Sequence, residues 1–159
     1  MIGNDIVDLN LAGKSSQWKS NGFLNKVFTP DEQHVILQSG DDRFSLIWRM
    51  WSMKESAYKL HFRSNLKRAL NPTRFICSLE SDSRGRVAVD SKTYCIDIDL
   101  NKNLIHSIAK LCKSEYNIVY RTVSAESLDS VRKETIRSLV QSFSRHNGWQ
   151  PGMVMFQKN

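Results

Sequence analysis

The hydrophobic pattern changes from a helical period to a strand period near the middle of this chain, and that change limits the folds that the chain can adopt. Apolar residues recur every three to four positions between residues 41 and 61, as on the buried face of a helix. Residues 75–123 instead hold short alternating runs that are rich in β-branched residues, which is typical of half-buried strands. Helices followed by a series of short strands predict an α+β protein with a mostly antiparallel sheet.

Capping and turn residues divide the chain into expected elements. Thr29, Pro30 and Glu32 provide an N-cap, a first-turn proline and a capping-box glutamate. We expect strands over 2–9, 75–79, 86–89, 94–100, 104–111 and 116–123, and helices over 29–39, 41–61 and 124–143. Residues 10–25 are expected to form a loop or an irregular helix. These elements predict one domain over 1–143, with a long central helix packed on the sheet, and an irregular tail over 144–159.

The charge of the chain indicates an anionic partner without naming it. The 159 residues carry a net charge of +7, with a sequence pI of about 9.5. Such a surface attracts nucleic acid, phosphorylated cofactors, acidic proteins or anionic membranes, and it is equally compatible with a basic face that is only solvated. The start of the chain lacks a signal-peptide pattern, and no apolar run is long enough for a membrane helix. We therefore expect a cytoplasmic protein.

The three cysteines, Cys77, Cys95 and Cys112, are odd in number and form no CxxC pair. This pattern argues against a disulfide framework and against a zinc site. We expect three buried thiols on strands, in a reducing compartment.

The helix expected over 41–61 has two distinct faces. Its core face holds Ile47, Met50, Trp51, Lys54 and Tyr58. An adjacent stripe holds Trp48, Ser52, Glu55 and Lys59. Taken alone, Glu55 and Lys59 are also compatible with an ordinary exposed ion pair one helical turn apart.

Asp5 lies inside the first expected strand, where a carboxylate must face solvent, pair with a cation or bind a metal. A strand carboxylate and the helix carboxylate Glu55 can together form an open site for Mg²⁺, which also takes phosphate and water ligands. Lys54 and Lys59 are close enough in sequence to neutralise the remaining phosphate charge.

Three segments of the sequence together resemble the 4′-phosphopantetheinyl transferase superfamily, and in particular its single-lobe holo-[acyl-carrier-protein] synthases. They are the opening run 2–9 (IGNDIVDL), the linking segment 28–32 (FTPDE) and the helix segment 51–59 (WSMKESAYK). The resemblance implies the fold of the 4′-phosphopantetheinyl transferases. It also implies Mg²⁺ as cofactor and coenzyme A as substrate. It implies transfer of the 4′-phosphopantetheine arm to a carrier-protein serine, with release of 3′,5′-ADP.

By this resemblance, Asp5 and Glu55 are the metal ligands, and Glu55, Lys59 and Asp5 are the catalytic residues. Some larger relatives carry a further acid where this chain has Val7, so water is expected to complete the metal shell. The residues expected to bind the cofactor are Lys54, Lys59, Arg49, Ser52 and His106. His106 is the nearest match to a late-strand serine–histidine segment of the family, and it is also compatible with an ordinary strand residue.

The resemblance also implies partners: an acidic apo acyl or peptidyl carrier protein of lipid, polyketide or peptide synthesis, and further copies of this chain in a trimer or dimer. Neither nucleic acid nor a membrane is expected. The chain departs from the short synthases at 60–64, where LHFRS replaces a glycine-rich loop. The alternatives are a basic binding module without catalysis, and a degenerate relative that binds coenzyme A but has lost its activity.

Overall fold

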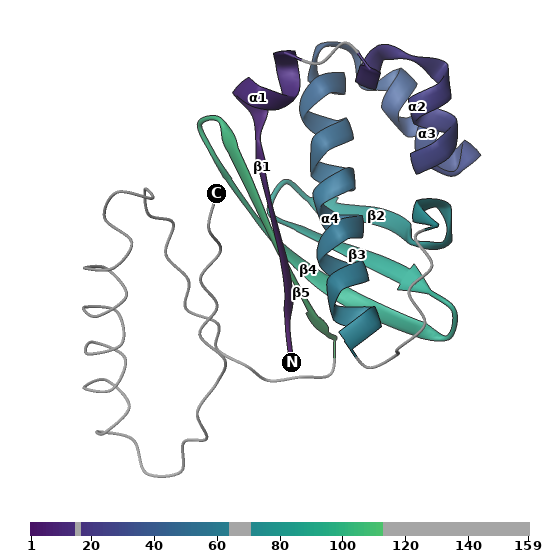
Figure 1. Cartoon of the computed structure of the whole chain (residues 1–159), viewed down its shortest axis with the longest axis vertical. Coiled ribbons are helices and arrows are strands. Elements are labelled where there is room, and N and C mark those ends of the chain that lie inside the picture. Colours follow the sequence, from purple (N-terminus) through teal and green to yellow (C-terminus); the bar gives the residue numbers. More distant parts are fainter. Residues whose placement is uncertain (15–16, 64–70, 113–159) are drawn as a thin grey trace, which may run out of the picture. The chain divides into compact units, whose positions relative to one another are not determined.

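The computed structural model describes residues 1–14, 17–63 and 71–112, and Figure 1 shows how their elements are arranged. Every described residue lies in one compact unit, Met1–Ser114. The strand expected over 116–123, the helix expected over 124–143 and the tail lie outside the described residues. None of the helices that the structure describes has the length and hydropathy needed to cross a membrane.

Within the described residues, five antiparallel strands form a sheet in the order β1-β5-β4-β3-β2. They are β1 (Gly3–Asp8), β2 (Ile76–Ser81), β3 (Arg84–Val89), β4 (Lys92–Asn101) and β5 (Leu104–Leu111). Strands β2 to β5 follow one another as hairpins, and β1 pairs with the outer side of β5. The expected fold class, α+β with a mostly antiparallel sheet, is confirmed.

The helices precede the hairpins in the chain, and the longest of them crosses one face of the sheet (Figure 1). They are α1 (Leu9–Lys14), α2 (Asn21–Val27), α3 (Pro30–Gln38) and α4 (Arg43–Arg63), with the 3-10 turns η1 (Gln17–Lys19), η2 (Gly40–Asp42) and η3 (Pro72–Arg74). The capping box of α3 forms as expected, because Thr29 Oγ1 accepts from the Glu32 N–H and Glu32 Oε2 accepts from the Thr29 N–H. Much of the stretch 10–25 is helical rather than a loop.

The hydrophobic core lies between α4 and the sheet. Helix α4 contributes Ile47, Met50, Met53, Ala57 and Leu60, and the strands contribute Val7, Val87, Val89, Tyr94, Ile96, Ile98 and Ile105. Of the expected core face of α4, Trp51 and Tyr58 are only partly buried. Burial of this apolar surface is what holds a helix on a sheet.

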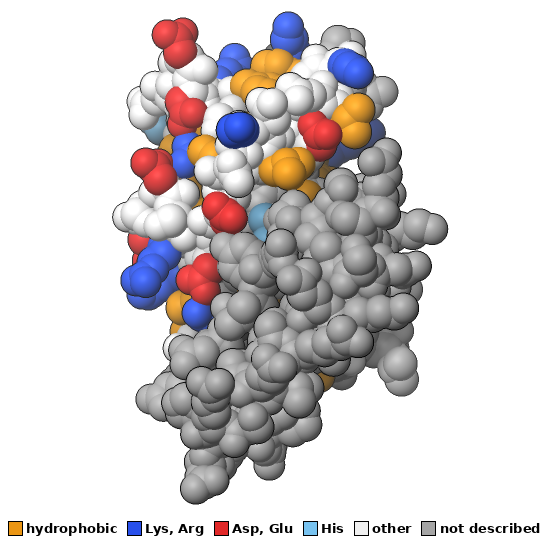
Figure 2. Space-filling view, turned by 90° about the vertical axis from the view of Figure 1, so that its left-hand side faces the viewer, with side chains coloured by type: hydrophobic (Ala, Val, Ile, Leu, Met, Phe, Trp, Pro, Cys, Tyr) orange, Lys and Arg blue, Asp and Glu red, His pale blue; other side chains and the backbone are white. Residues whose placement is uncertain are grey.

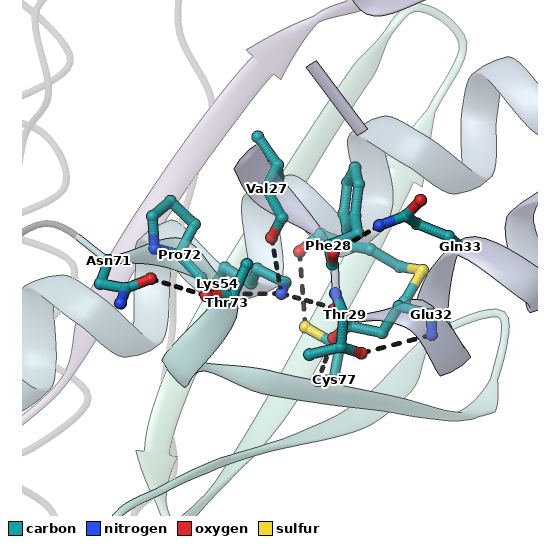
Figure 3. A network of polar contacts seen from close by, with 11 residues as sticks. Val27, Phe28, Thr29, Glu32, Gln33, Lys54, Asn71, Pro72, Thr73 and Cys77 are labelled. Atoms are coloured by element: carbon teal, nitrogen blue, oxygen red, sulfur yellow. Dashed lines mark hydrogen bonds and ion pairs between the residues drawn. The ribbon is translucent and has the colours of Figure 1, made fainter. Parts of the chain in front are cut away.

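A buried ion pair fixes α4 to the elements beside it (Figure 3). Lys54 Nζ donates to Glu32 Oε2 at 2.7 Å, to the Val27 carbonyl at 2.9 Å and to the Pro72 carbonyl at 3.1 Å. Glu32 also accepts from the backbone N–H of Cys77 at 2.6 Å. Both charged side chains are only 3% exposed, so these bonds are what compensates for their removal from water.

The cysteine expectation was wrong for two of the three residues. Cys95 and Cys112 form a disulfide, with a Cα–Cα distance of 4.9 Å. The cause is the β4–β5 hairpin, which pairs Cys95 with Lys110 and so brings Cys112, two residues further on, to the same side. Cys77 is a buried free thiol, as expected, and burial raises its pKa.

The backbone of β1 lies directly against the backbone of α4 at Gly3. A Cβ atom at this position would lie 2.8 Å from the Leu60 nitrogen and closer still to the Ser56 carbonyl oxygen. Neither backbone atom can move aside as the end of a flexible side chain would. Gly3 therefore permits an approach that any other residue prevents.

We expect Gly3→Ala to lower the free energy of unfolding by about 1–3 kcal/mol, because the added methyl group forces β1 away from α4. Urea denaturation measures this change. Gly22→Ala is the matched control, since nothing lies within 4 Å of a Cβ at Gly22 in α2, and it should raise stability by up to about 1 kcal/mol. Equal effects of the two substitutions would contradict the close approach.

We expect Lys54→Met to lower the free energy of unfolding by about 3–5 kcal/mol, because it leaves the Glu32 carboxylate buried without a cation. Lys110→Met is the comparison, since Lys110 Nζ contacts Asp97 at a similar 2.6 Å but with side chains 24% and 40% exposed. That loss should stay below about 1 kcal/mol. Similar losses in urea denaturation would show that burial does not set the strength of these pairs.

Candidate active site

Asp5 occupies the third position of β1 and points toward α4. Side chains alternate along a strand, so Asp5 shares the helix-facing side of β1 with Gly3 and Val7. Its carboxylate Oδ1 accepts a hydrogen bond from Lys59 Nζ at 2.7 Å. The carboxylate is 11% exposed and the lysine side chain 35% exposed, so the ion pair lies at the border between the core and solvent.

Glu55 lies one helical turn before Lys59 on α4 and is close to both charges of the Lys59–Asp5 ion pair. Burial raises the pKa of the Glu55 carboxyl above its ordinary value, and the nearby charge of Asp5 raises it further, while Lys59 partly opposes both effects. An effect of the Asp5 charge on Glu55 requires the two carboxylates to lie close together. The structure thus brings Asp5, Glu55 and Lys59 to one place, although 54 residues separate Asp5 from Lys59 in the chain.

Two buried hydroxyl groups lie on the same two sides of the site, one on α4 and one on the sheet. Ser52 lies on α4 three residues before Glu55, and Ser107 pairs directly with Asp5 across the β1–β5 ladder. Both side chains are fully buried, and neither Oγ has a hydrogen-bond partner in the described part of the protein. The position of Ser107 depends on strand register, and in the sequence Ser107 stands out only as the neighbour of His106 in the segment compared with the family's serine–histidine segment.

Lys54 does not join this group. Its three ammonium protons are used by Glu32, Val27 and Pro72, so none remains for a phosphate. Lys54 thus lies apart from this group, because the residue next to Glu55 points to a different side of the helix, and its expected role in cofactor binding stays a prediction. Its role is to hold α4 in place.

Arg49 is likewise occupied. Its guanidinium contacts Asp42 at 2.6 Å and Asp82 at 3.0 Å, and its side chain is 7% exposed. A buried arginine held between two carboxylates has little charge left to offer a cofactor. In the structure Arg49 lies at the junction of η2, α4 and the β2–β3 turn, and its expected role in cofactor binding stays a prediction.

His106 lies on β5 but on the other side of the sheet from Asp5. Its Cα partner is Ile6, the neighbour of Asp5, and adjacent strand residues face opposite sides. Burial lowers the pKa of His106, and the charges of Asp99 and Asp5 partly restore it. The structure therefore does not place His106 in the group formed by Asp5, Glu55 and Lys59.

The donor set of this group fits an open Mg²⁺ site. Among the described residues, no cluster of three or more histidine, cysteine, aspartate or glutamate side chains could hold a metal ion. Two carboxylates that repel each other do fit Mg²⁺, which is commonly held by one or two protein carboxylates, with water and substrate phosphate as the other ligands. A closed structural metal site does not fit.

Substitutions around Glu55 should move its pKa in opposite directions in the metal-free protein. Asp5→Asn removes a negative charge and should lower the pKa of Glu55, whereas Lys59→Met removes a positive charge and should raise it. NMR titration of the Glu55 side-chain carboxyl carbon measures both shifts. Asp97→Asn, on the opposite side of the sheet, should leave it unchanged, and a shift as large as that of Asp5→Asn would contradict the proximity.

The fold that carries this site is similar to the folds of proteins with known structures. Three crystal structures of holo-[acyl-carrier-protein] synthases have a similar fold. The Helicobacter pylori protein, in complex with coenzyme A, aligns with a TM-score of 0.54 at 16% identity, over 70% of this chain and 99% of its own. The Neisseria meningitidis protein gives 0.54 at 14% identity, over 69% and 96% of the two chains. The Thermotoga maritima protein gives 0.52 at 13% identity, over 84% and 89%.

At these identities the similarity shows the fold alone. A search of curated proteins by sequence found no match. The family model of the 4′-phosphopantetheinyl transferase superfamily, however, matches residues 1–120, a span that includes Asp5, Glu55 and Lys59. The chain therefore belongs to the 4′-phosphopantetheinyl transferase superfamily.

Proposed function

We propose that this protein transfers the 4′-phosphopantetheine arm of coenzyme A to a serine of an apo acyl or peptidyl carrier protein, with Mg²⁺ as cofactor and 3′,5′-ADP as the second product. One observation carries the proposal. Asp5 of β1 meets Glu55 and Lys59 of α4 at one partly buried place, in a chain of the 4′-phosphopantetheinyl transferase superfamily.

Each of the three residues has a distinct role in this proposal. Asp5 and Glu55 provide the carboxylate oxygens that hold Mg²⁺. The ion, when bound, offsets the negative charge of the coenzyme A diphosphate. Lys59, whose side chain is partly exposed, donates to a phosphate oxygen and stabilises the charge that gathers there during transfer.

The reaction also needs an acceptor for the proton of the carrier serine. Either the Glu55 carboxylate or a water molecule in the site accepts the serine proton. Because Glu55 also has to hold the cation, the two acceptors are equal alternatives. The serine oxygen bonds to the β-phosphorus, the bond from that phosphorus to the bridging oxygen breaks, and 3′,5′-ADP leaves.

The charge of the chain is compatible with the partners of this reaction. A net charge of +7 favours encounter with an anionic cofactor and with an acidic carrier protein. A non-catalytic basic binding module would have the same net charge. Among the described residues on the face shown in Figure 2, however, acidic and basic side chains are interspersed.

The test is incubation of the protein with coenzyme A, Mg²⁺ and a panel of apo carrier proteins, followed by intact-mass spectrometry. One carrier should gain the mass of a single phosphopantetheine arm. Asp5→Ala, Glu55→Ala and Lys59→Ala should each lower the rate of transfer by about 100-fold or more, as expected when a charge-stabilising group is lost.

Asp97→Ala is the control for this series, because Asp97 is also a carboxylate paired with a lysine but lies on the other side of the sheet from Asp5. It should transfer at the wild-type rate. Circular dichroism checks that every variant is folded. Wild-type rates in folded Asp5→Ala and Glu55→Ala proteins would refute the assignment of the two acids.

A further inference from the structure

The ion pair between Lys59 and Asp5 joins two residues that have different ligands in the proposed function. Asp5 is assigned to the cation and Lys59 to the phosphate, yet in the ligand-free structure each is the partner of the other, at 2.7 Å. The ammonium group therefore occupies the side of the Asp5 carboxylate where positive charge is stabilised. The cation cannot bind Asp5 at this position unless Lys59 moves away. The phosphate cannot bind Lys59 unless Lys59 leaves Asp5.

We propose that Lys59 is the resting counter-ion of the metal site, and that its transfer from Asp5 to the coenzyme A phosphate couples the binding of the cation to that of the coenzyme. This inference rests on the proposed function and deepens it. It makes Lys59 a specificity-determining residue, through which the site selects the cation and the diphosphate together over either one alone.

Lys59 is the partner that can move. Its long side chain is 35% exposed, and among the described residues its Nζ forms a hydrogen bond with Asp5 alone. Lys54, on the same helix, differs in both respects, because it is 3% exposed and bonded to three acceptors. A flexible, partly solvated ammonium can exchange partners at low cost, whereas a buried one with three acceptors cannot.

Asp5 is the partner that stays. It is 11% exposed, and the β1–β5 register fixes its backbone opposite Ser107. The buried Oγ of Ser107 has no hydrogen-bond partner among the described residues. This hydroxyl lies on the same side of the sheet as Asp5 and is not part of the Lys59–Asp5 contact.

The coupling follows from the charges that each ligand would leave behind. A cation that binds alone must displace Lys59 and leave its ammonium without a counter-charge. A coenzyme phosphate that binds alone must draw Lys59 away and leave Asp5 facing Glu55, whose charges repel each other. When both bind, every charge has a partner, and by linkage each ligand raises the affinity for the other to the same extent.

The test is calorimetric titration of Mg²⁺ into the full-length protein, with and without saturating coenzyme A and without any carrier protein. For the wild type, coenzyme A should tighten Mg²⁺ binding by about fivefold or more, within the usual range for linked sites. Lys59→Met should bind Mg²⁺ alone about fivefold or more tightly than the wild type, and coenzyme A should tighten its Mg²⁺ binding less than it does in the wild type. Lys59→Arg, which keeps the charge and the reach, should retain the coupling.

Lys110→Met is the matched control for a general effect of charge. It also removes one ammonium group that contacts an aspartate, but on the other side of the sheet, and its Mg²⁺ affinity should remain that of the wild type. The wild-type protein gives a second readout through amine labelling followed by peptide mass spectrometry. Labelling of Lys59 should become faster with Mg²⁺ alone and slow again when coenzyme A is added.

The outcomes separate this inference from the proposed function. If the wild type modifies a carrier, but Lys59→Met binds Mg²⁺ no more tightly and Mg²⁺ does not change the labelling of Lys59, the coupling role is refuted and the transferase proposal stands. If Lys110→Met tightens Mg²⁺ binding as much as Lys59→Met, general charge explains the effect and the inference fails. If the wild type neither binds Mg²⁺ nor modifies any carrier, both proposals fail.

Discussion

The approach of the β1 backbone to the α4 backbone at Gly3 is the constraint on which the rest of the site depends. A Cβ atom there would overlap backbone atoms of Ser56 and Leu60. With no side chain between them, the strand and the helix lie close enough for Asp5, two residues along, to reach Lys59. On a different side of α4, the buried Lys54–Glu32 pair ties the helix to α3 and β2. The orientation of α4, and with it the direction of Glu55, is therefore fixed by two independent contacts.

Local patterns in the sequence were sufficient for most of the described fold. The capping residues of α3 specify its start by bonds within four consecutive residues. The strands from β2 to β5 follow from alternation and from turn residues between them. The stripe that carries Glu55 and Lys59 follows from the helical period. Each of these features depends on neighbours in the chain, and this is why a single sequence reveals them.

The parts that sequence reasoning missed depend on partners distant in the chain. Helical periodicity places Arg49 on a face of α4, but it does not show that Asp82, 33 residues later, lies beside it. The same holds for Lys54, whose acceptors come from three other segments. The disulfide and the position of His106 depend on strand pairing. This pairing brings Cys95 and Cys112 together and puts His106 on the other side of the sheet from Asp5. Register of this kind is not encoded in spacing alone.

The β1–β5 register has a consequence for how such a chain can diverge. Because strand side chains alternate, a deletion or insertion of one residue within β1 would turn Asn4 or Ile6 toward the helix and Asp5 away from it. Substitutions at most positions of the strand do not change which of its side chains face the helix. Sequence change in this region is therefore tolerated as replacement but not as a change of length, so that similarity between relatives can become very low while the spacing from Gly3 to Asp5 persists.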